Sequence, residues 1–262
     1  MATFHRRLGS SVSTDNVFAP PPGVAGPGPK RRRWILPVVP LVLCVLLVVG
    51  SIFGMLTTHK RLVVPSPAMR PTIEAGEGVL IRLGSGEDVR RGDVVVFHGG
   101  QDWKDGDYIK RVVALGGDTV EVGADNKLQV NGKPIPETYR LNPDPRGGLQ
   151  AEFPQVTVPP GSAFMLGDWR NNSLDSRAHG AVPVSQIFGT VVYTGLRPIA
   201  QPQDFAEAGF PGPRTDLGDP LRFLVGSLLA GVALAVLGLV LLVVVLVTRR
   251  RNHLPTAGAG AG

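Results

Sequence analysis

The 262-residue sequence contains a single cysteine, Cys44, which lies in an apolar stretch near the N-terminus. The central part of the chain can therefore form no disulfide bond, and its stability has to come from a hydrophobic core. The sequence also lacks clustered histidine and cysteine residues at metal-ligand spacing. His98 and His179 stand alone, and loop positions are the better interpretation for both. We expect neither a metal nor an organic cofactor.

Two stretches lack charged residues altogether: residues 34–58 and 223–248 contain no Asp, Glu, Lys or Arg. A helix needs about 20 apolar residues to cross a bilayer, whereas apolar core helices of soluble proteins rarely exceed about 14. Both stretches therefore predict transmembrane helices rather than buried core helices. We expect the first to be a retained signal-anchor and not a cleaved signal peptide, because no small-x-small site follows within residues 50–60.

Acidic residues are scarce at both ends of the chain. Six Lys/Arg and one acid precede the first apolar stretch, and three arginines with no acid follow the second. Basic residues near a span stay in the cytoplasm, so both termini are expected there, with the main domain outside the plasma membrane. The segment between the spans carries 18 Lys/Arg and 20 Asp/Glu, so the net charge of +6 comes from the tails. This pattern predicts contact with membrane lipid and gives no support to nucleic-acid binding.

Composition divides the chain into six parts. Pro, Gly and Ser dominate the N-terminal segment, which predicts a disordered tail. The expected parts are a disordered cytoplasmic tail (1–33), transmembrane helix 1 (34–58), an extracytoplasmic domain (59–200), a polar linker (201–222), transmembrane helix 2 (223–248) and a cytoplasmic tail (249–262).

The expected extracytoplasmic domain is predicted to be mostly β, as a barrel or folded sheet. Its apolar runs are short, rich in Val, Ile and aromatic residues, and bounded by Gly or Asp, with no sustained 3.6-residue period. Asn131-Gly132 is a strong hairpin signal, and Pro159-Pro160-Gly161 predicts a turn. The expected strands are residues 78–83, 93–98, 108–115, 119–122, 127–130, 155–158, 163–166 and 190–193.

One expected strand carries two adjacent basic residues, Lys110 and Arg111. Successive side chains in a strand point to opposite faces, so the two lie on different faces. If Lys110 is buried, the pKa of its amine falls, and the neutral amine can act as a general base. The alternative is a solvated pair on an edge strand, which the usual exposure of charged residues favours.

A second polar pattern packs two acids and two arginines into ten positions: Asp168, Arg170, Asp175 and Arg177. One interpretation is a surface loop whose ion pairs contribute little to stability. The other is a loop that orients a catalytic side chain, in which Ser173 donates or accepts a hydrogen bond.

Together these patterns resemble bacterial type I signal peptidase (signal peptidase I, peptidase family S26), a membrane peptidase with a Ser/Lys dyad. Residues 64–73 resemble the family's P-S-x-S-M-x-P-T box, and residues 108–118 its Y-I-K-R-V-x-x-x-x-G-D box. Residues 167–183 resemble its G-D-x-R-x-N-S-x-D-S-R-x-x-G-x-V-P box, and residues 91–97 its R-G-D-hydrophobic box. The resemblance covers about residues 60–195, and the order of the boxes makes it specific.

The resemblance implies a role for each matching residue. Lys110 matches the general-base lysine, and Ser173 matches the serine that hydrogen-bonds it. Ser66 matches the residue whose hydroxyl helps to form the oxyanion hole. The matching supporting and structural positions are Asp168, Asp175, Arg177, Met69 and Pro71.

The position of the nucleophile holds Ala68, which has no atom that can attack a carbonyl carbon. The resemblance implies three further departures, at positions that the boxes leave open: Pro67 stands where a small or flexible residue is usual, Trp169 where Asn is usual and Asn171 where Asp is usual. If Ser66 lies in an extended strand, it shares a face with Ala68 but sits roughly 6.5 Å away along the chain. A nucleophile has to lie within about 2.6–3.2 Å of its base, so we expect Ser66 to be a poor substitute.

The family reaction implied by the resemblance is endoproteolytic cleavage of signal peptides from exported preproteins, and Ala68 predicts that this activity is impaired. The alternative is a catalytically inactive homologue that binds signal peptides or regulates an active paralogue. A third reading, a membrane-anchored β domain unrelated to peptidases, requires the four boxes to have arisen by chance. The expected partners are signal peptides, membrane lipid and an active signal peptidase paralogue.

Overall fold

The computed structural model describes residues 35–100, 103–141, 152–199, 202–212 and 220–252. The tail expected at residues 1–33 lies outside the described residues, as does most of the tail expected at residues 249–262.

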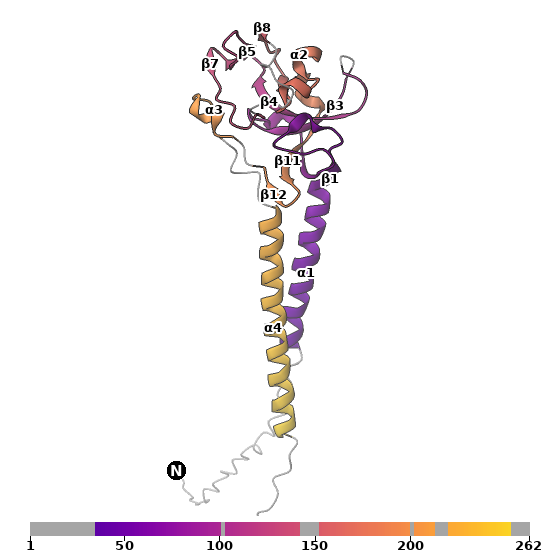
Figure 1. Cartoon of the computed structure of the whole chain (residues 1–262). Helices are drawn as coiled ribbons and strands as arrows, with labels where there is room; N and C mark the ends of the chain where they lie inside the picture. The colour runs from indigo at the N-terminus through magenta and orange to yellow at the C-terminus, as the bar shows by residue number, and fades with distance from the viewer. Residues whose placement is uncertain (1–34, 101–102, 142–151, 200–201, 213–219, 253–262) are drawn as a thin grey trace, which may run out of the picture.

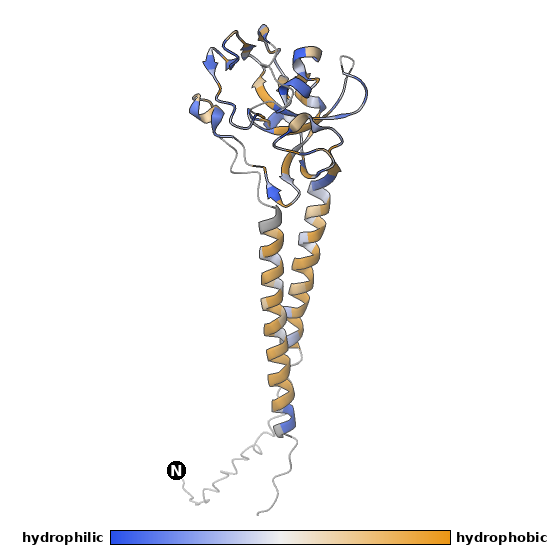
Figure 2. Ribbon diagram, viewed as in Figure 1, coloured by the Kyte–Doolittle hydropathy of each residue, from blue (hydrophilic) through white to orange (hydrophobic). Residues whose placement is uncertain are grey.

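Two long helices extend from one end of a β domain (Figure 1). α1 (Ile35–Thr58) has 24 residues and α4 (Pro220–Asn252) has 33. At a rise of about 1.5 Å per residue, each is longer than the roughly 30 Å hydrocarbon core of a bilayer. Their apolar parts, Pro37–Thr58 and Phe223–Arg250, are long and apolar enough to span a membrane. Figure 2 shows hydrophobic residues along almost the whole of both helices, where the charge-free stretches predicted them.

The two helices lie side by side and approach closely at glycine residues (Figure 1). A Cβ atom on Gly231 would lie 3.0 Å from Val48 Cγ2, and one on Gly238 would lie 2.9 Å from Leu41 Cγ. A larger residue at either position would therefore push the helices apart. Small residues at close contacts are typical of membrane helix pairs, which gain little from the hydrophobic effect.

The β domain consists of two antiparallel sheets within the described residues, so the predicted fold class is confirmed. In spatial order, the larger sheet contains β1 (His59–Val63), β2 (Gly78–Leu83), β11 (Ile187–Thr194), β3 (Val94–His98), β4 (Asp107–Leu115), β9 (Ser162–Leu166) and β10 (Val182–Pro183), with β12 (Arg197–Pro198) paired to β11. The smaller sheet contains β7 (Lys133–Pro134), β6 (Leu128–Val130), β5 (Thr119–Val122) and β8 (Phe153–Thr157).

The two turn signals in the sequence form turns in the structure. Asn131 and Gly132 have φ values of 52° and 72°, the left-handed conformation that a two-residue hairpin requires, and they join β6 to β7. At the start of β9, Ser162 N–H donates a hydrogen bond to Pro159 O at 3.1 Å, which closes the turn.

Three clusters of buried apolar side chains hold the domain together. One joins the two sheets, with Val120 from the smaller sheet and Phe164 from the larger. Another is built around Phe97 and Val112. The third contains Met69, 0% exposed, and so fixes the segment that follows β1 in the interior.

The segment at residues 201–222, expected to be a polar linker, is partly folded. It contains the short helix α3 (Asp204–Glu207), and Phe205, 1% exposed, belongs to the cluster that joins the sheets. Composition missed this because a few apolar side chains, Phe205 with Ala208 and Phe210, pack an otherwise polar segment against the core.

The loop positions expected for the two histidines are wrong. His98 is the last residue of β3, and His179 is the last residue of α2 (Ser176–His179). His98 Nδ1 lies 2.6 Å from Asp107 Oδ1, so it is not isolated.

Candidate active site

Lys110 lies in the interior of the larger sheet. Its strand, β4, has β3 on one side and β9 on the other, and Lys110 is opposite Val95 of β3. Lys110 is 5% exposed and Arg111 is 1% exposed. The alternative of a solvated pair on an edge strand is therefore wrong: β4 is not an edge, and both charged side chains are buried.

Burial lowers the pKa of the Lys110 amine below its ordinary value. Asp175 and Asp168 oppose this shift, and the positive charge of Arg177 adds to it. The net change is downward, so this amine is neutral more often than an exposed lysine at the same pH. A neutral amine can accept a proton from a hydroxyl group, which is what a general base does.

The segment that carries Ala68 is a tight turn and not the extended strand assumed for it. Ser66 precedes a 3₁₀ helix, η1 (Pro67–Met69), and Ser66 Oγ accepts a hydrogen bond from Ala68 N–H at 3.3 Å. The separation of roughly 6.5 Å that an extended strand predicts therefore does not apply. Pro67 suits this turn, because its fixed φ matches the first position of a helix.

One cavity of about 610 Å³ is lined both by the turn that carries Ala68 and by the strand that carries Lys110. Ser66, Ala68, Lys110 and Ser173 all line it. Lys110 and Ala68 thus share a pocket, which is the juxtaposition that the sequence boxes imply. Ala68 O also accepts a hydrogen bond from Trp169 N–H at 3.0 Å, which ties η1 to the last box.

Asp175 holds together the loop at residues 167–177, which belongs to the box at residues 167–183. It accepts Gly167 N–H at 3.0 Å and makes a two-point ion pair with Arg177, at 2.8 and 2.9 Å. Burial alone would raise the pKa of Asp175, but Arg177 and Gly167 N–H outweigh it and hold the pKa below its ordinary value. Arg177 Nη2 also donates to Arg170 O at 2.7 Å. Asp175 is buried and Arg177 is half-buried, so the pair braces the loop and is not a fully solvated surface pair.

Ser173 lies against the backbone of the same loop, with its hydroxyl buried. A Cβ atom on Gly167 would lie 2.2 Å from Ser173 Oγ, so glycine is required where these two residues meet. The contacts of the described residues do not include the expected hydrogen bond between Ser173 Oγ and Lys110 Nζ, although both residues line the pocket. The role of Ser173 stays a prediction.

A second buried ion pair involves the neighbour of Lys110 in β4. Arg111 and Asp168, 1% and 0% exposed, make a two-point pair at 2.8 and 2.6 Å. Thr72 Oγ1 donates to Asp168 Oδ2 at 2.5 Å and accepts from Arg111 Nη2 at 3.0 Å. Because Thr72 follows η1 closely in the chain, this network links the segment of Ala68 to the strand of Lys110.

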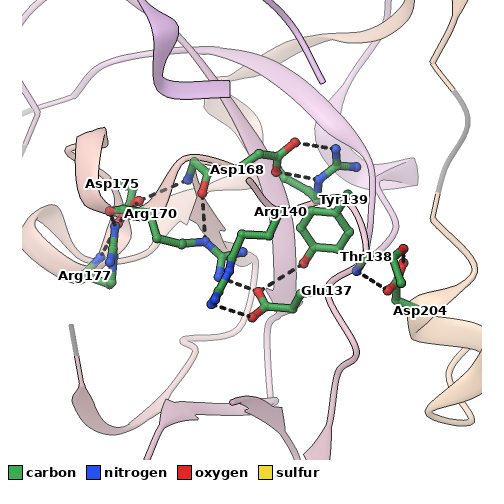
Figure 3. A network of polar contacts seen from close by, with 11 residues as sticks. Glu137, Thr138, Tyr139, Arg140, Asp168, Arg170, Asp175, Arg177 and Asp204 are labelled. Carbon is green, nitrogen blue, oxygen red and sulfur yellow. Dashed lines mark hydrogen bonds and ion pairs between the residues drawn. The ribbon is translucent and has the colours of Figure 1, made fainter. Parts of the chain in front are cut away.

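Two members of the network, Glu137 and Tyr139, were not predicted from the sequence. Glu137 is 8% exposed and forms an ion pair with Arg170, and the Arg111 Cζ atom lies 4.2 Å from the centroid of the Tyr139 ring. Figure 3 shows Tyr139 and Glu137 pointing into the same group of charged side chains. The sequence gives no signal for either residue, because both lie outside the boxes; a lone Glu is usually exposed, and a lone Tyr indicates neither burial nor exposure.

The other departures from the boxes lie beside the pocket. Trp169 is 8% exposed, and the Arg70 guanidinium lies 5.6 Å from its ring centroid. Asn171 lines the cavity as a neutral residue where the resemblance leads us to expect an aspartate. The electrostatic character of this rim therefore differs from that expected of the boxes.

A buried lysine amine with a lowered pKa, beside a pocket and supported by neighbouring ion pairs, is an arrangement that suits a general base. Comparison with known proteins identifies the family. The sequence model of the family described as "Signal peptidase, peptidase S26" matches residues 31–195 of this chain. The chain belongs to this signal peptidase family.

Several relatives share much of the chain. Signal peptidase I of Mycobacterium tuberculosis is 33% identical over 219 residues, which cover 62% of this chain and 73% of that protein. Probable signal peptidase I-1 of Synechocystis sp. is 34% identical over 176 residues, covering 64% and 85%. Signal peptidase I of Bacillus caldolyticus is 39% identical over 148 residues, covering 52% and 79%.

Proposed function

We propose that this protein is a membrane-anchored member of the family that binds the signal peptides of exported preproteins but lacks the nucleophile that would cleave them. One observation carries the proposal: Ala68 and Lys110 line the same pocket. The amine and its supporting ion pairs are present, and a methyl group stands where the family has a hydroxyl.

The absence of a hydroxyl at position 68 has a large effect on catalysis and a small one on binding. Alanine cannot form the acyl-enzyme bond of a serine peptidase. In a comparable serine protease, losing the nucleophile lowers kcat by on the order of 10⁶. Peptide recognition does not require that hydroxyl, and the cavity of about 610 Å³ with its apolar residues Ile109 and Leu174 remains. Binding is therefore the function that the pocket retains.

The proposal places the pocket at the outer surface of the plasma membrane. α1 and α4 would cross the bilayer, with the basic residues that flank them in the cytoplasm. Ala68 follows the last residue of α1, Thr58, by only ten positions, which keeps the pocket near the bilayer. A signal peptide emerging from the membrane would meet the site there, and an active signal peptidase paralogue is the proposed protein partner.

The 3₁₀ turn favours a second candidate, in which Ser66 is the nucleophile and Lys110 its base. Ser66 lines the same pocket as Lys110, and the turn brings its Oγ to 3.3 Å from Ala68 N. Because Ser66 Oγ accepts that hydrogen bond, its own proton remains available to a base. In this candidate the chain is an active peptidase with a displaced nucleophile.

Preprotein processing separates the two candidates. The purified full-length protein, Ala68→Ser and Ser66→Ala are each incubated with a preprotein that carries a small-x-small site. We expect cleavage only by Ala68→Ser, together with saturable binding of a labelled signal peptide by the unaltered protein. Cleavage by the unaltered protein that disappears in Ser66→Ala would establish the second candidate. If the unaltered protein neither binds nor cleaves, both candidates are rejected.

A further inference from the structure

The segment between the β domain and α4 contacts the charged network beside the pocket. α3 lies in this segment, beyond the residues that the family model matches. Asp204, 2% exposed, accepts Thr138 N–H at 2.6 Å and the Thr138 hydroxyl at 3.0 Å. A buried carboxylate is stable only when donors satisfy it, so these bonds fix Asp204 and Thr138 to each other.

Thr138 lies between two residues that reach the site (Figure 3). Glu137, before it, forms an ion pair with Arg170, the first residue of η3 (Arg170–Asn172). Tyr139, after it, lies against the guanidinium of Arg111, the neighbour of Lys110. The residues that directly follow Arg170 all line the cavity: Asn171, Asn172, Ser173 and Leu174.

The backbone at Glu137 indicates that this turn needs external support. Its φ is +56°, a left-handed conformation that is uncommon for residues other than glycine. Such a conformation persists only where surrounding contacts hold it. The Glu137 side chain is held by Arg170 and Arg140, and the next backbone N–H is held by Asp204. Asp204 is therefore one of the contacts that keep Glu137 in place.

We propose that Asp204 is a positioning residue for the pocket. By fixing Thr138, it fixes Glu137 and Tyr139, and through them the loop after Arg170 and the guanidinium of Arg111. The segment that leads into α4 thereby shapes a site whose other parts lie within the matched family region. This inference rests on the proposed function, because it assumes that the pocket binds signal peptides.

The test uses full-length protein in lipid nanodiscs and compares Asp204→Ala with Glu207→Ala. Glu207 is an exposed acid on the same short helix and serves as the matched control. Two properties are measured: the reactivity of the Lys110 amine against pH, by competitive labelling and mass spectrometry, and the Kd for a labelled signal peptide. In Asp204→Ala, a loosened loop admits water to Lys110, so its apparent pKa rises towards the ordinary value. The Kd for the signal peptide rises about fivefold, which lies within the range measured for residues that affect a binding site without contacting the ligand. Glu207→Ala changes neither property.

The conservative variant and the melting temperature separate positioning from stability alone. Asp204→Asn keeps an oxygen that can accept Thr138 N–H, so we expect it to restore most of both properties. An Asp204→Ala protein that melts at a lower temperature but titrates at Lys110 like the unaltered protein, well below its melting point, would overturn the proposal.

Two further outcomes are also decisive. If Asp204→Ala does not fold, Asp204→Ser is used instead: its shorter, uncharged side chain no longer reaches Thr138 N–H, and an unchanged Lys110 titration in that folded variant also overturns the proposal. If the unaltered protein binds no signal peptide, the proposed function fails, while the Lys110 titration still decides the role of Asp204.

Discussion

The two sides of the pocket differ in what they retain of the family boxes. Around the strand of Lys110, the ion pairs Arg111–Asp168 and Asp175–Arg177 are complete; the first is buried, and in the second Asp175 is buried and Arg177 half-buried. On the other side, Ala68 and Pro67 replace residues of the first box. Under the proposed function, the first side supplies the supporting groups of a peptidase and the second lacks its reactive group.

This difference follows from what each change costs the folded protein. Removing one member of a buried ion pair leaves an uncompensated charge and destabilises a protein by about 3–5 kcal/mol. Replacing a pocket serine by alanine removes one oxygen beside an open cavity, and substitutions of this size usually cost about 1 kcal/mol or less. Losing one partner of such a pair is therefore costly to the fold whether or not catalysis takes place, so position 68 is the better indicator of activity.

The largest expected effect is on catalysis, in a protein whose hydroxyl has been restored. If Lys110 is the base, adding Lys110→Ala to Ala68→Ser abolishes the gained cleavage, a loss on the order of 10⁶ in kcat for residues of one catalytic unit. Preprotein cleavage is measured by gel, with Lys104→Ala, which changes an exposed lysine outside the cavity lining, as the control. Equal loss in the two lysine variants would contradict a specific role for Lys110.

The next effect is on stability and compares a buried ion pair with an exposed one. Arg111→Met leaves Asp168 charged and unpaired in the interior, so we expect a loss of about 3–5 kcal/mol in urea unfolding. Arg197→Met breaks the pair with Glu77, in which Arg197 is 69% exposed, and should cost at most about 1 kcal/mol. The double variant Arg111→Met/Asp168→Leu should recover much of the loss. Equal effects of the two single variants would show that burial does not distinguish the pairs.

Stability should also depend on pH through Lys110. Because the pKa of this amine is lowered in the folded state, the unfolded chain binds more protons between the folded pKa and the ordinary value of 10.5. Lys110 therefore destabilises the fold at neutral pH, and this penalty is relieved as pH rises through that window. Each unit of lowering corresponds to about 1.4 kcal/mol.

Lys110→Met isolates this contribution. The variant should be more stable than the unaltered protein at pH 7, and the difference should shrink as the pH approaches 10. Urea unfolding at a series of pH values measures both proteins, and subtraction removes the groups that they share. A difference that does not vary with pH would mean that the folded-state pKa of Lys110 is not lowered.

Some site residues can be located from the sequence and others cannot, and the difference is how far apart in the sequence their contact partners lie. Lys110 was found because a local box and strand alternation place it. Asp204 and Glu137 were missed because their partners lie 66 and 33 residues away in the sequence, where no local period indicates them. The turn at η1 was also missed. Ser66 itself is extended, with φ of −115° and ψ of 149°, as a residue before proline usually is, and the turn begins only at Pro67.

The smallest expected effect tests that turn directly. Ser66→Ala removes the oxygen that accepts Ala68 N–H at the start of η1, so we expect a loss of about 0.5–1 kcal/mol, the low end for helix caps because Ser66 is exposed to water. Ser85 is a matched control: it is exposed and precedes η2 (Gly86–Asp88), but its side chain makes no capping hydrogen bond. Ser85→Ala should leave urea unfolding unchanged. If the two variants unfold alike, the 3.3 Å contact does not stabilise the turn, and the hydroxyl of Ser66 is free to turn towards Lys110 instead.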